Sequence, residues 1–141
     1  MDSRKDVVDW FWKNGDEHMK ENFGISYNNG MSTFQPDFIV KFVDGTIGIF
    51  DTKSAGDRVE DTTIKAEALY KFIKDTNTNR PENFGKVIGG IVISKNYDSS
   101  TRTYRKFRVN YQEKYVDYDE DSSNWVLFET LLNNINLVNL F

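Results

Sequence analysis

Three residues of types that suit hydrolytic chemistry, two aspartates and a lysine, flank one apolar stretch of the chain. Pro36-Asp37 is followed by thirteen residues and then by Asp51-Thr52-Lys53. Carboxylates are natural ligands for Mg²⁺. A cation held by them polarises a phosphoryl oxygen and lowers the pKa of bound water, and a nearby ammonium stabilises the developing negative charge. The two aspartates and Lys53 therefore predict a site suited to hydrolysis of a phosphodiester.

These residues lie at the open end of a predicted β-hairpin. Residues 34–53 read as two strands joined by Asp44-Gly45, a pair that strongly favours a hairpin turn. Both arms are rich in Phe, Ile and Val, which is typical of central strands covered on both faces. Asp51 and Lys53 are two residues apart on one strand and so share a face.

The length of the hairpin loop decides whether Asp37 shares that face. A two-residue turn at Asp44-Gly45 pairs Asp37 with Thr52 and sends the two aspartates to opposite faces. A three-residue loop, residues 43–45, pairs Asp37 with Asp51 and places Gly45 at the left-handed position that such loops require. A bulge elsewhere in the hairpin would serve equally.

The N-terminal half contains two further predicted strands and a helix. Residues 21–27, followed by a turn at 28–30, read as one strand. Residues 6–13 favour another by residue type, although Ser3, Asp6 and Gly15 also fit the start and stop of a helix. A helix is predicted from near Thr62 to before Thr76 by apolar residues at helical spacing: Ile64, Ala68, Leu69, Phe72 and Ile73.

The C-terminal half again contains predicted strands followed by a predicted helix. Residues 87–94 and 103–111 read as strands. Apolar residues at helical spacing then predict a second amphipathic helix: Trp125, Phe128, Leu131, Leu132 and Ile135. This order indicates an α/β or α+β fold in which a mixed sheet is flanked by helices. The 141 residues suffice for a single domain, 1–141.

Composition limits the partners and the compartment. The chain has no cysteine, no signal-peptide pattern and no long apolar run, so a soluble, cytoplasmic protein is expected. The formal net charge is −4 and the pI near 5.0. A free-standing DNA-binding domain is usually basic, because phosphate neutralisation supplies much of its affinity. The charge therefore argues against nucleic acid as a partner, unless another part of a longer protein holds it.

The motif residues nevertheless resemble a nuclease family. PD, a hydrophobic hairpin and then D-x-K form the pattern of the PD-(D/E)xK nucleases. The longer string DFIVKFVDGTIGIFDTKSAGD, followed by KAEALYKFIK, resembles the C-terminal nuclease domain of type III restriction endonuclease subunits. The similarity runs from about Trp10 to about Val92. It implies a restriction-endonuclease-like fold, cleavage of DNA, and an acidic net charge compensated by other parts of the assembly.

The resemblance also implies roles for individual residues. Asp37 and Asp51 would be ligands for Mg²⁺, with Mn²⁺ as a substitute, the Thr52 carbonyl a further ligand, and Lys53 the catalytic lysine. Family members usually add an acidic residue on a helix before the first core strand, which could lie upstream of Met1 or be one of four residues here: Asp6, Asp9, Glu17 or Glu21.

The resemblance also implies a longer parent protein. Subunits of this kind carry a helicase motor that uses ATP and pair with a methyltransferase subunit. No GxxxxGK[ST] phosphate loop is present, so the motor is absent from this chain. The chain is therefore interpreted as a C-terminal fragment of a helicase–nuclease protein.

Other charged residues have simpler interpretations beside functional ones. Lys65 and Glu67 could face the site, but a solvated helix face is favoured. DNA phosphates could be contacted by a basic run, which could equally protect an edge strand: Arg102, Arg105, Lys106 and Arg108. Residues 117–121 read as an acidic loop, His18 lacks a partner for catalysis, and residues 10–12 favour a core or an interface over base stacking.

The leading hypothesis is a metal-dependent endodeoxyribonuclease domain of a type III restriction-modification system. One alternative is a catalytically silent nuclease-like module that positions DNA or a partner subunit. Another is a stand-alone resolvase or repair nuclease.

Overall fold

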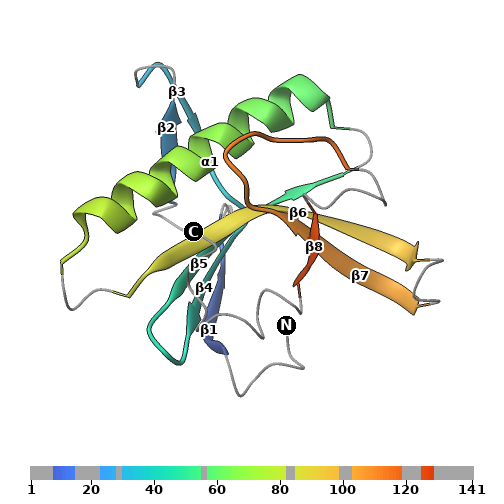
Figure 1. Cartoon of the computed structure of the whole chain (residues 1–141), viewed down its shortest axis with the longest axis horizontal. Helices are drawn as coiled ribbons and strands as arrows, with labels where there is room; N and C mark the ends of the chain where they lie inside the picture. The colour runs from blue at the N-terminus through green and yellow to red at the C-terminus, as the bar shows by residue number, and fades with distance from the viewer. Residues whose placement is uncertain are drawn as a thin grey trace.

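A mixed six-stranded sheet covered on one face by a long helix organises the chain in the computed structural model (Figure 1). The structure describes residues 8–14, 23–27, 30–54, 57–81, 85–98, 103–118 and 125–128. Their elements are β1 (Val8–Lys13), β2 (Ile25–Tyr27), β3 (Ser32–Phe34), β4 (Phe38–Phe42), β5 (Ile47–Lys53), α1 (Val59–Asn79), β6 (Val87–Asp98), β7 (Thr103–Asn110) and β8 (Val126–Leu127). The architecture is α+β, in agreement with the expected fold class.

The strand order in the sheet is β1-β4-β5-β6-β7-β8. β5 and β6 run parallel, because α1 carries the chain back across the sheet between them, and the other neighbours are antiparallel. β2 and β3 form a separate hairpin that lies beside α1 (Figure 1). The carboxyl end of β5 and the beginning of α1 therefore meet at one end of the sheet.

The hairpin β4–β5 has the three-residue loop that the site requires. Phe38 pairs with Phe50 and Lys41 with Ile47, and the Phe42 N–H donates to the Thr46 carbonyl at 2.8 Å. Gly45 has φ +91°, in the region that favours glycine. Of the alternatives left open by the sequence, the structure thus has the three-residue loop, residues 43–45.

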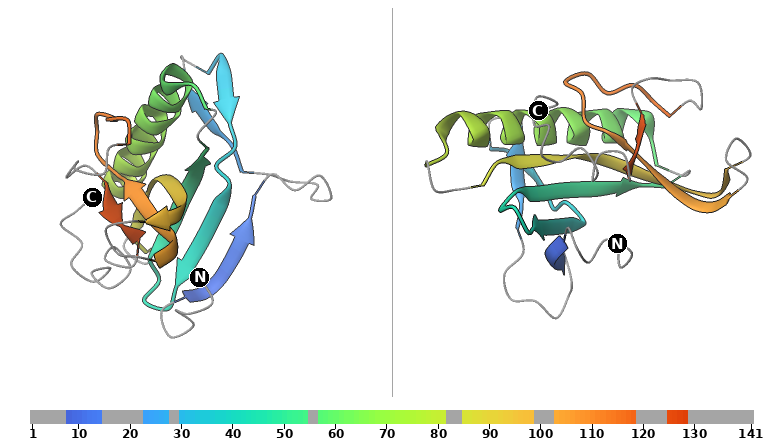
Figure 2. Two further views of the ribbon diagram at one scale, coloured as in Figure 1. Left: turned by 90° about the vertical axis from the view of Figure 1, so that its right-hand side faces the viewer. Right: turned by 60° about the horizontal axis from the view of Figure 1, so that its bottom comes forward.

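The helix α1 packs on the sheet through a single stripe. Thr62, Ala66, Leu69 and Ile73 are buried at spacings of three and four residues, which places them on one helical face. Figure 2 shows α1 lying across one face of β5 and β6. These residues join a core that includes Ile49 and Ile91, while a second core, around Phe50 and Val92, covers the opposite face of the sheet.

Several predicted elements need correction. α1 is longer than expected at both ends, since it begins at Val59 and ends at Asn79. β6 extends past residue 94 to Asp98. The second helix predicted around Trp125 is wrong at Val126–Leu127, which form β8 and pair with Arg108 and Val109 of β7. The rest of that prediction, residues 129–135, lies outside the described residues.

The strand predicted for residues 6–13 is confirmed as β1, and that for 103–111 as β7. The strand at 21–27 is confirmed only over Ile25–Tyr27. The separate short strand β3 was not anticipated, because Ser32 and Thr33 were assigned to no element and Phe34 to the beginning of the following hairpin.

We expect Gly45→Ala to lower the free energy of unfolding by about 1–2 kcal/mol, because an L side chain is strained at positive φ. Gly45→Asn should lower it less, since asparagine tolerates this region. Urea denaturation of the two variants and the wild type measures both effects. Equal stability of all three proteins would contradict the loop geometry.

Candidate active site

Asp37 and Asp51 stand opposite each other at the open end of the hairpin β4–β5. The last pair of β4 and β5 is Phe38 with Phe50. The same register, continued by one residue, places Asp37 opposite Asp51. Phe42 and Thr46 are a hydrogen-bonded pair. Because hydrogen-bonded and non-hydrogen-bonded pairs alternate, Asp37 and Asp51 form a non-hydrogen-bonded pair, in which side chains lie closest.

The Asp37 carboxylate accepts two hydrogen bonds from Thr52, the residue that follows Asp51 on β5. Its Oδ2 accepts a hydrogen bond from the Thr52 N–H at 2.9 Å and another from the Thr52 hydroxyl. The residue opposite Thr52 in the extended register is Pro36, which has no N–H to donate to the Thr52 carbonyl. The proline of the motif thus leaves the Thr52 carbonyl without a donor across the strands, while the Pro36 carbonyl is bonded to Asn14 and the Thr52 N–H to Asp37.

Asn14, which the sequence did not single out, fixes the chain just before Asp37. This side chain is buried, and its amide donates to the carbonyls of Pro36 at 2.8 Å and Phe23 at 2.6 Å. Its oxygen accepts the Phe23 N–H at 2.9 Å, and its own backbone N–H donates to the Asp37 carbonyl at 2.8 Å. No motif reveals this role, because the partners are 9 to 23 positions away in the sequence.

Asp51 is a buried carboxyl in contact with a second one. Its side chain is 5% exposed, and its pKa is raised from 3.8 to about 7. The causes are burial first, then the negative charge of Asp37, with a hydrogen bond between the two carboxyl groups also raising it. The Lys65 ammonium and a backbone hydrogen bond from Asp37 act in the opposite direction.

Lys53 shares the Asp51 face of β5 and is held by an ion pair. Its ammonium lies 3.4 Å from Asp117 Oδ1, and its side chain is 8% exposed. The Tyr115 hydroxyl donates to the same oxygen at 2.9 Å. Burial alone would raise the pKa of Asp117, but the hydrogen bonds from Tyr115 and the Tyr118 backbone, with the Lys53 charge, lower it. Asp117 was interpreted only as part of an acidic loop, so its contact with Lys53 is new.

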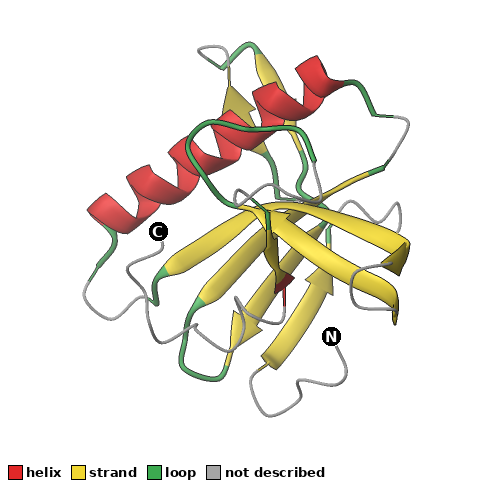
Figure 3. Ribbon diagram, turned by 45° about the vertical axis from the view of Figure 1, so that its right-hand side comes forward, coloured by secondary structure: helices red, strands yellow, loops and turns green. Residues whose placement is uncertain are grey.

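The loop that carries Asp117 is anchored by an aromatic cluster. Trp125 is buried, donates from its indole nitrogen to the Val116 carbonyl at 2.8 Å, and lies edge-on to Tyr115 and Tyr118. This packing folds residues 111–118 back along α1 (Figure 3), so that Asp117 returns to the end of β5.

Lys65, for which a solvated helix face was favoured, is partly buried on α1 and acts electrostatically on two acidic side chains. Its charge lowers the pKa of both Asp51 and Asp57. Asp57 ends the turn after β5, where it accepts hydrogen bonds from the Ser54 N–H at 2.8 Å and the Ser54 hydroxyl at 3.1 Å. Those bonds, led by the backbone one, lower its pKa. Glu67, the other helix residue considered, is exposed.

The remaining candidate residues do not gather here in the described part of the chain. Asp9 lies 3.9 Å from Lys41 as an exposed ion pair. Arg108 is on β7 and pairs across the strands with Leu127, while Lys106 is on β7 with its side chain outside the described residues. Outside the described residues as well are Asp6, Glu17, His18, Glu21 and Arg102.

The donor set fits a magnesium-like cation. The described residues hold no group of three or more acidic or histidine side chains placed around one metal position. Mg²⁺, however, commonly binds through one or two carboxylates and keeps several waters. Two carboxyl groups in contact, one of them with a pKa near 7, need either a proton or a cation between them. Asp37 and Asp51 meet that requirement.

The raised pKa of Asp51 predicts an unusual pH dependence of stability in EDTA. Between pH 4 and 7 the folded protein retains a proton that the unfolded chain has released, so Asp51 makes the free energy of unfolding fall as pH rises through about 7. Asp51→Asn should remove this contribution. The variant should exceed wild type by a few kcal/mol, on the order of 2–4, at pH 8 and show little gain near pH 4. Urea denaturation at several pH values measures it, and a difference that stays constant with pH would contradict the buried contact.

Comparison with known proteins assigns no relative. No protein-family model, no curated protein and no solved structure matches this chain. Among the described residues, no helix combines the length and the apolar character needed to cross a membrane. The interpretation of the site therefore depends on its own geometry.

Proposed function

We propose that this chain is a metal-dependent nuclease domain that hydrolyses phosphodiester bonds in DNA, with Asp37, Asp51 and Lys53 as its catalytic residues. The observation that carries the proposal is the contact between two carboxyl groups at the end of β5, one of them buried with a pKa near 7. Buried charges are costly unless they are paired or bind a metal. The presence of the Asp51 carboxyl at a buried position therefore favours a functional role for this residue over a structural one.

The site residues divide the chemistry between them. Asp37, Asp51 and the Thr52 carbonyl would hold Mg²⁺, or Mn²⁺ in its place. When bound, the cation would polarise the phosphoryl oxygen and make its bound water a better nucleophile. Asp37 at the same time fixes Thr52 through two hydrogen bonds, which keeps the main chain of β5 in place.

Lys53 would act on the reacting groups. Its ammonium is almost buried and lies on the Asp51 face of β5, where it can orient the attacking water and stabilise the charge that develops on the phosphate. Asp117 positions this ammonium at 3.4 Å while no phosphate is bound. Lys65 supplies a second positive charge near Asp51.

The finer classification is also a proposal. A hairpin followed by a helix and a parallel strand is consistent with a restriction-endonuclease-like sheet of the PD-(D/E)xK type. The resemblance of the motif strings supports placing the chain in a type III restriction-modification system. A covalently linked motor would then use ATP, and a methyltransferase subunit would be its partner.

One observation favours the catalytically silent alternative. In the described part of the chain no third acidic side chain joins Asp37 and Asp51 around a metal position. A module of this kind could retain the fold and the carboxyl contact and yet bind cations too weakly for catalysis. Metal binding and cleavage, measured on the same variants, separate the two possibilities.

We expect calorimetric titration to show Mn²⁺ binding to the wild type, a large loss of affinity in Asp51→Asn, and nearly unchanged affinity in Lys53→Met. Asp51 is assigned as a ligand, whereas lysine is not one. In the longer parent protein, Lys53→Met should reduce single-turnover cleavage by about 10²–10³. The isolated chain should cleave DNA poorly because of its net charge of −4.

Lys71→Met, which changes an exposed lysine on α1, is the matched control for charge and side-chain length. It should leave both metal affinity and cleavage unchanged. Mn²⁺ affinity equal in wild type and Asp51→Asn would remove the metal site. Cleavage by Lys53→Met at the wild-type rate would remove the role given to the lysine.

A further inference from the structure

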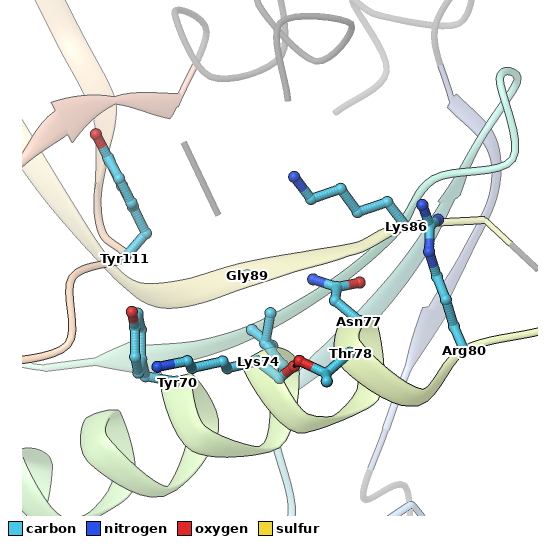
Figure 4. Close-up of a pocket in the computed structure, with 9 residues that line it drawn as sticks. Tyr70, Lys74, Asn77, Thr78, Arg80, Lys86, Gly89 and Tyr111 are labelled. Carbon is cyan, nitrogen blue, oxygen red and sulfur yellow. Dashed lines mark hydrogen bonds between the residues drawn. The ribbon is translucent and has the colours of Figure 1, made fainter. Parts of the chain in front are cut away.

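A second concave site lies on the flank of α1 that faces the beginning of β6 (Figure 4). It has a volume of about 390 Å³. Tyr70, Lys74 and Asn77 of α1 line one side, and Lys86 and Tyr111 lie across from them, over β6 (Figure 4). Arg80, just after α1, closes one end. We call this site the basic groove.

The charge of the basic groove opposes that of the whole chain. Nine described residues line the groove, and among these three side chains are cationic, Lys74, Arg80 and Lys86, and none is acidic, although the chain carries a net charge of −4. Lys86 has a lowered pKa, caused first by burial and then by the positive charge of Arg80. Two cations that repel each other beside a hollow are stabilised by an anion bound between them.

The groove is preformed, because hydrogen bonds fix its walls. Asn77 donates to the Val87 carbonyl at 2.8 Å and accepts the Val87 N–H at 2.8 Å, which ties the end of α1 to the beginning of β6. Asn110 is 2% exposed and lines a small space that shares Tyr70, Gly89 and Tyr111 with the groove. Within the described structure its amide nitrogen has no hydrogen-bond acceptor, so a donor remains in the small space that adjoins the groove.

We propose that the basic groove binds phosphate groups of a nucleic-acid backbone. Lysine, arginine, tyrosine and asparagine side chains are the groups that commonly contact phosphates and sugars. Figure 4 shows the three cationic groups apart from one another, with the Lys74 ammonium beside Tyr70, Arg80 toward the other end and Lys86 across from α1, so they line a path instead of surrounding one point. A path of separated cations suits a chain of phosphodiesters better than a single anion.

The basic groove is separate from the carboxylate site. Lys74 follows Lys65 by nine residues and Arg80 follows it by fifteen, which corresponds to about 14 and 22 Å along the helix axis. On duplex DNA this distance spans roughly four to six base pairs. The proposal concerns binding alone, so it stands or falls independently of cleavage at Asp37 and Asp51.

Fluorescence anisotropy in EDTA tests the proposal, with a short labelled oligonucleotide as single strand and as duplex. Lys74→Glu, Arg80→Glu and Lys86→Glu should each weaken binding by about fivefold at low salt. For the duplex, each should also reduce the slope of log affinity against log salt by about 0.9. Lys71→Glu, which makes the same charge change on the other flank of α1, should bind like the wild type. Lys74→Arg and Arg80→Lys, which keep the charge, should retain binding.

Circular dichroism identifies variants that fail to fold. If Lys74→Glu or Arg80→Glu fails to fold, the oligonucleotide affinity of Lys74→Arg or Arg80→Lys is compared with that of the wild type instead. Oligonucleotide binding that is unaffected by all three reversals, or equally reduced by Lys71→Glu, would overturn the proposal. So would a groove-dependent affinity for pyrophosphate without one for the oligonucleotide, which would indicate a free phosphate ligand. Equal competition by an acidic peptide at matched ionic strength would instead assign the groove to a protein partner.

Discussion

The contact between two carboxyl groups at the end of β4–β5 depends on the length of one loop. Two unit charges about 4 Å apart repel by about 4 kcal/mol at an effective dielectric constant of 20. A shift of one residue in register would relieve that repulsion by sending Asp37 to the other face. Gly45, at φ +91°, and the Asp44 carboxylate, which accepts the Thr46 N–H at 2.9 Å, stabilise the longer loop instead. The unfavourable contact is therefore maintained by local turn chemistry.

At the same end of the hairpin, the main-chain hydrogen bonds between β4 and β5 do not continue. Pro36 cannot donate a hydrogen bond across to β5, and Asn14 binds the Pro36 carbonyl on the other side. The Thr52 N–H turns to the Asp37 carboxylate. Unpaired backbone groups are costly when buried. The open end of β4–β5 is therefore stable only where side chains, water or a ligand replace the missing hydrogen bonds between the strands. A cation bound by carboxylate and carbonyl oxygens is such a ligand.

Local patterns predicted the hairpin well, because its turn residues and alternating apolar residues act over a few positions. They predicted Val126–Leu127 wrongly, since Trp125 and Phe128 on either side fit a helical spacing and only the pairing of Val126 and Leu127 with β7 makes these two residues a strand. The start of α1 was misplaced because the helix has no side-chain cap to mark its first residue. Asn14, Asp117 and Lys65 reach the site through contacts between distant segments, and no spacing rule encodes them.

Charge then explains why a phosphate-binding surface would lie away from the carboxylates. The side chains that interact around Asp51 comprise four acids, Asp37, Asp51, Asp57 and Asp117, and two bases, Lys53 and Lys65, a balance of −2 when all are ionised. That balance attracts a divalent cation and, before one binds, repels phosphate. Since exposed charges beyond about 10 Å are largely screened in 0.1 M salt, a cationic groove 14 Å or more along α1 can attract a polyanion without neutralising the carboxylates. Separation of the two charges along one helix would thus let an acidic chain keep the proposed cation site and the proposed anion site together.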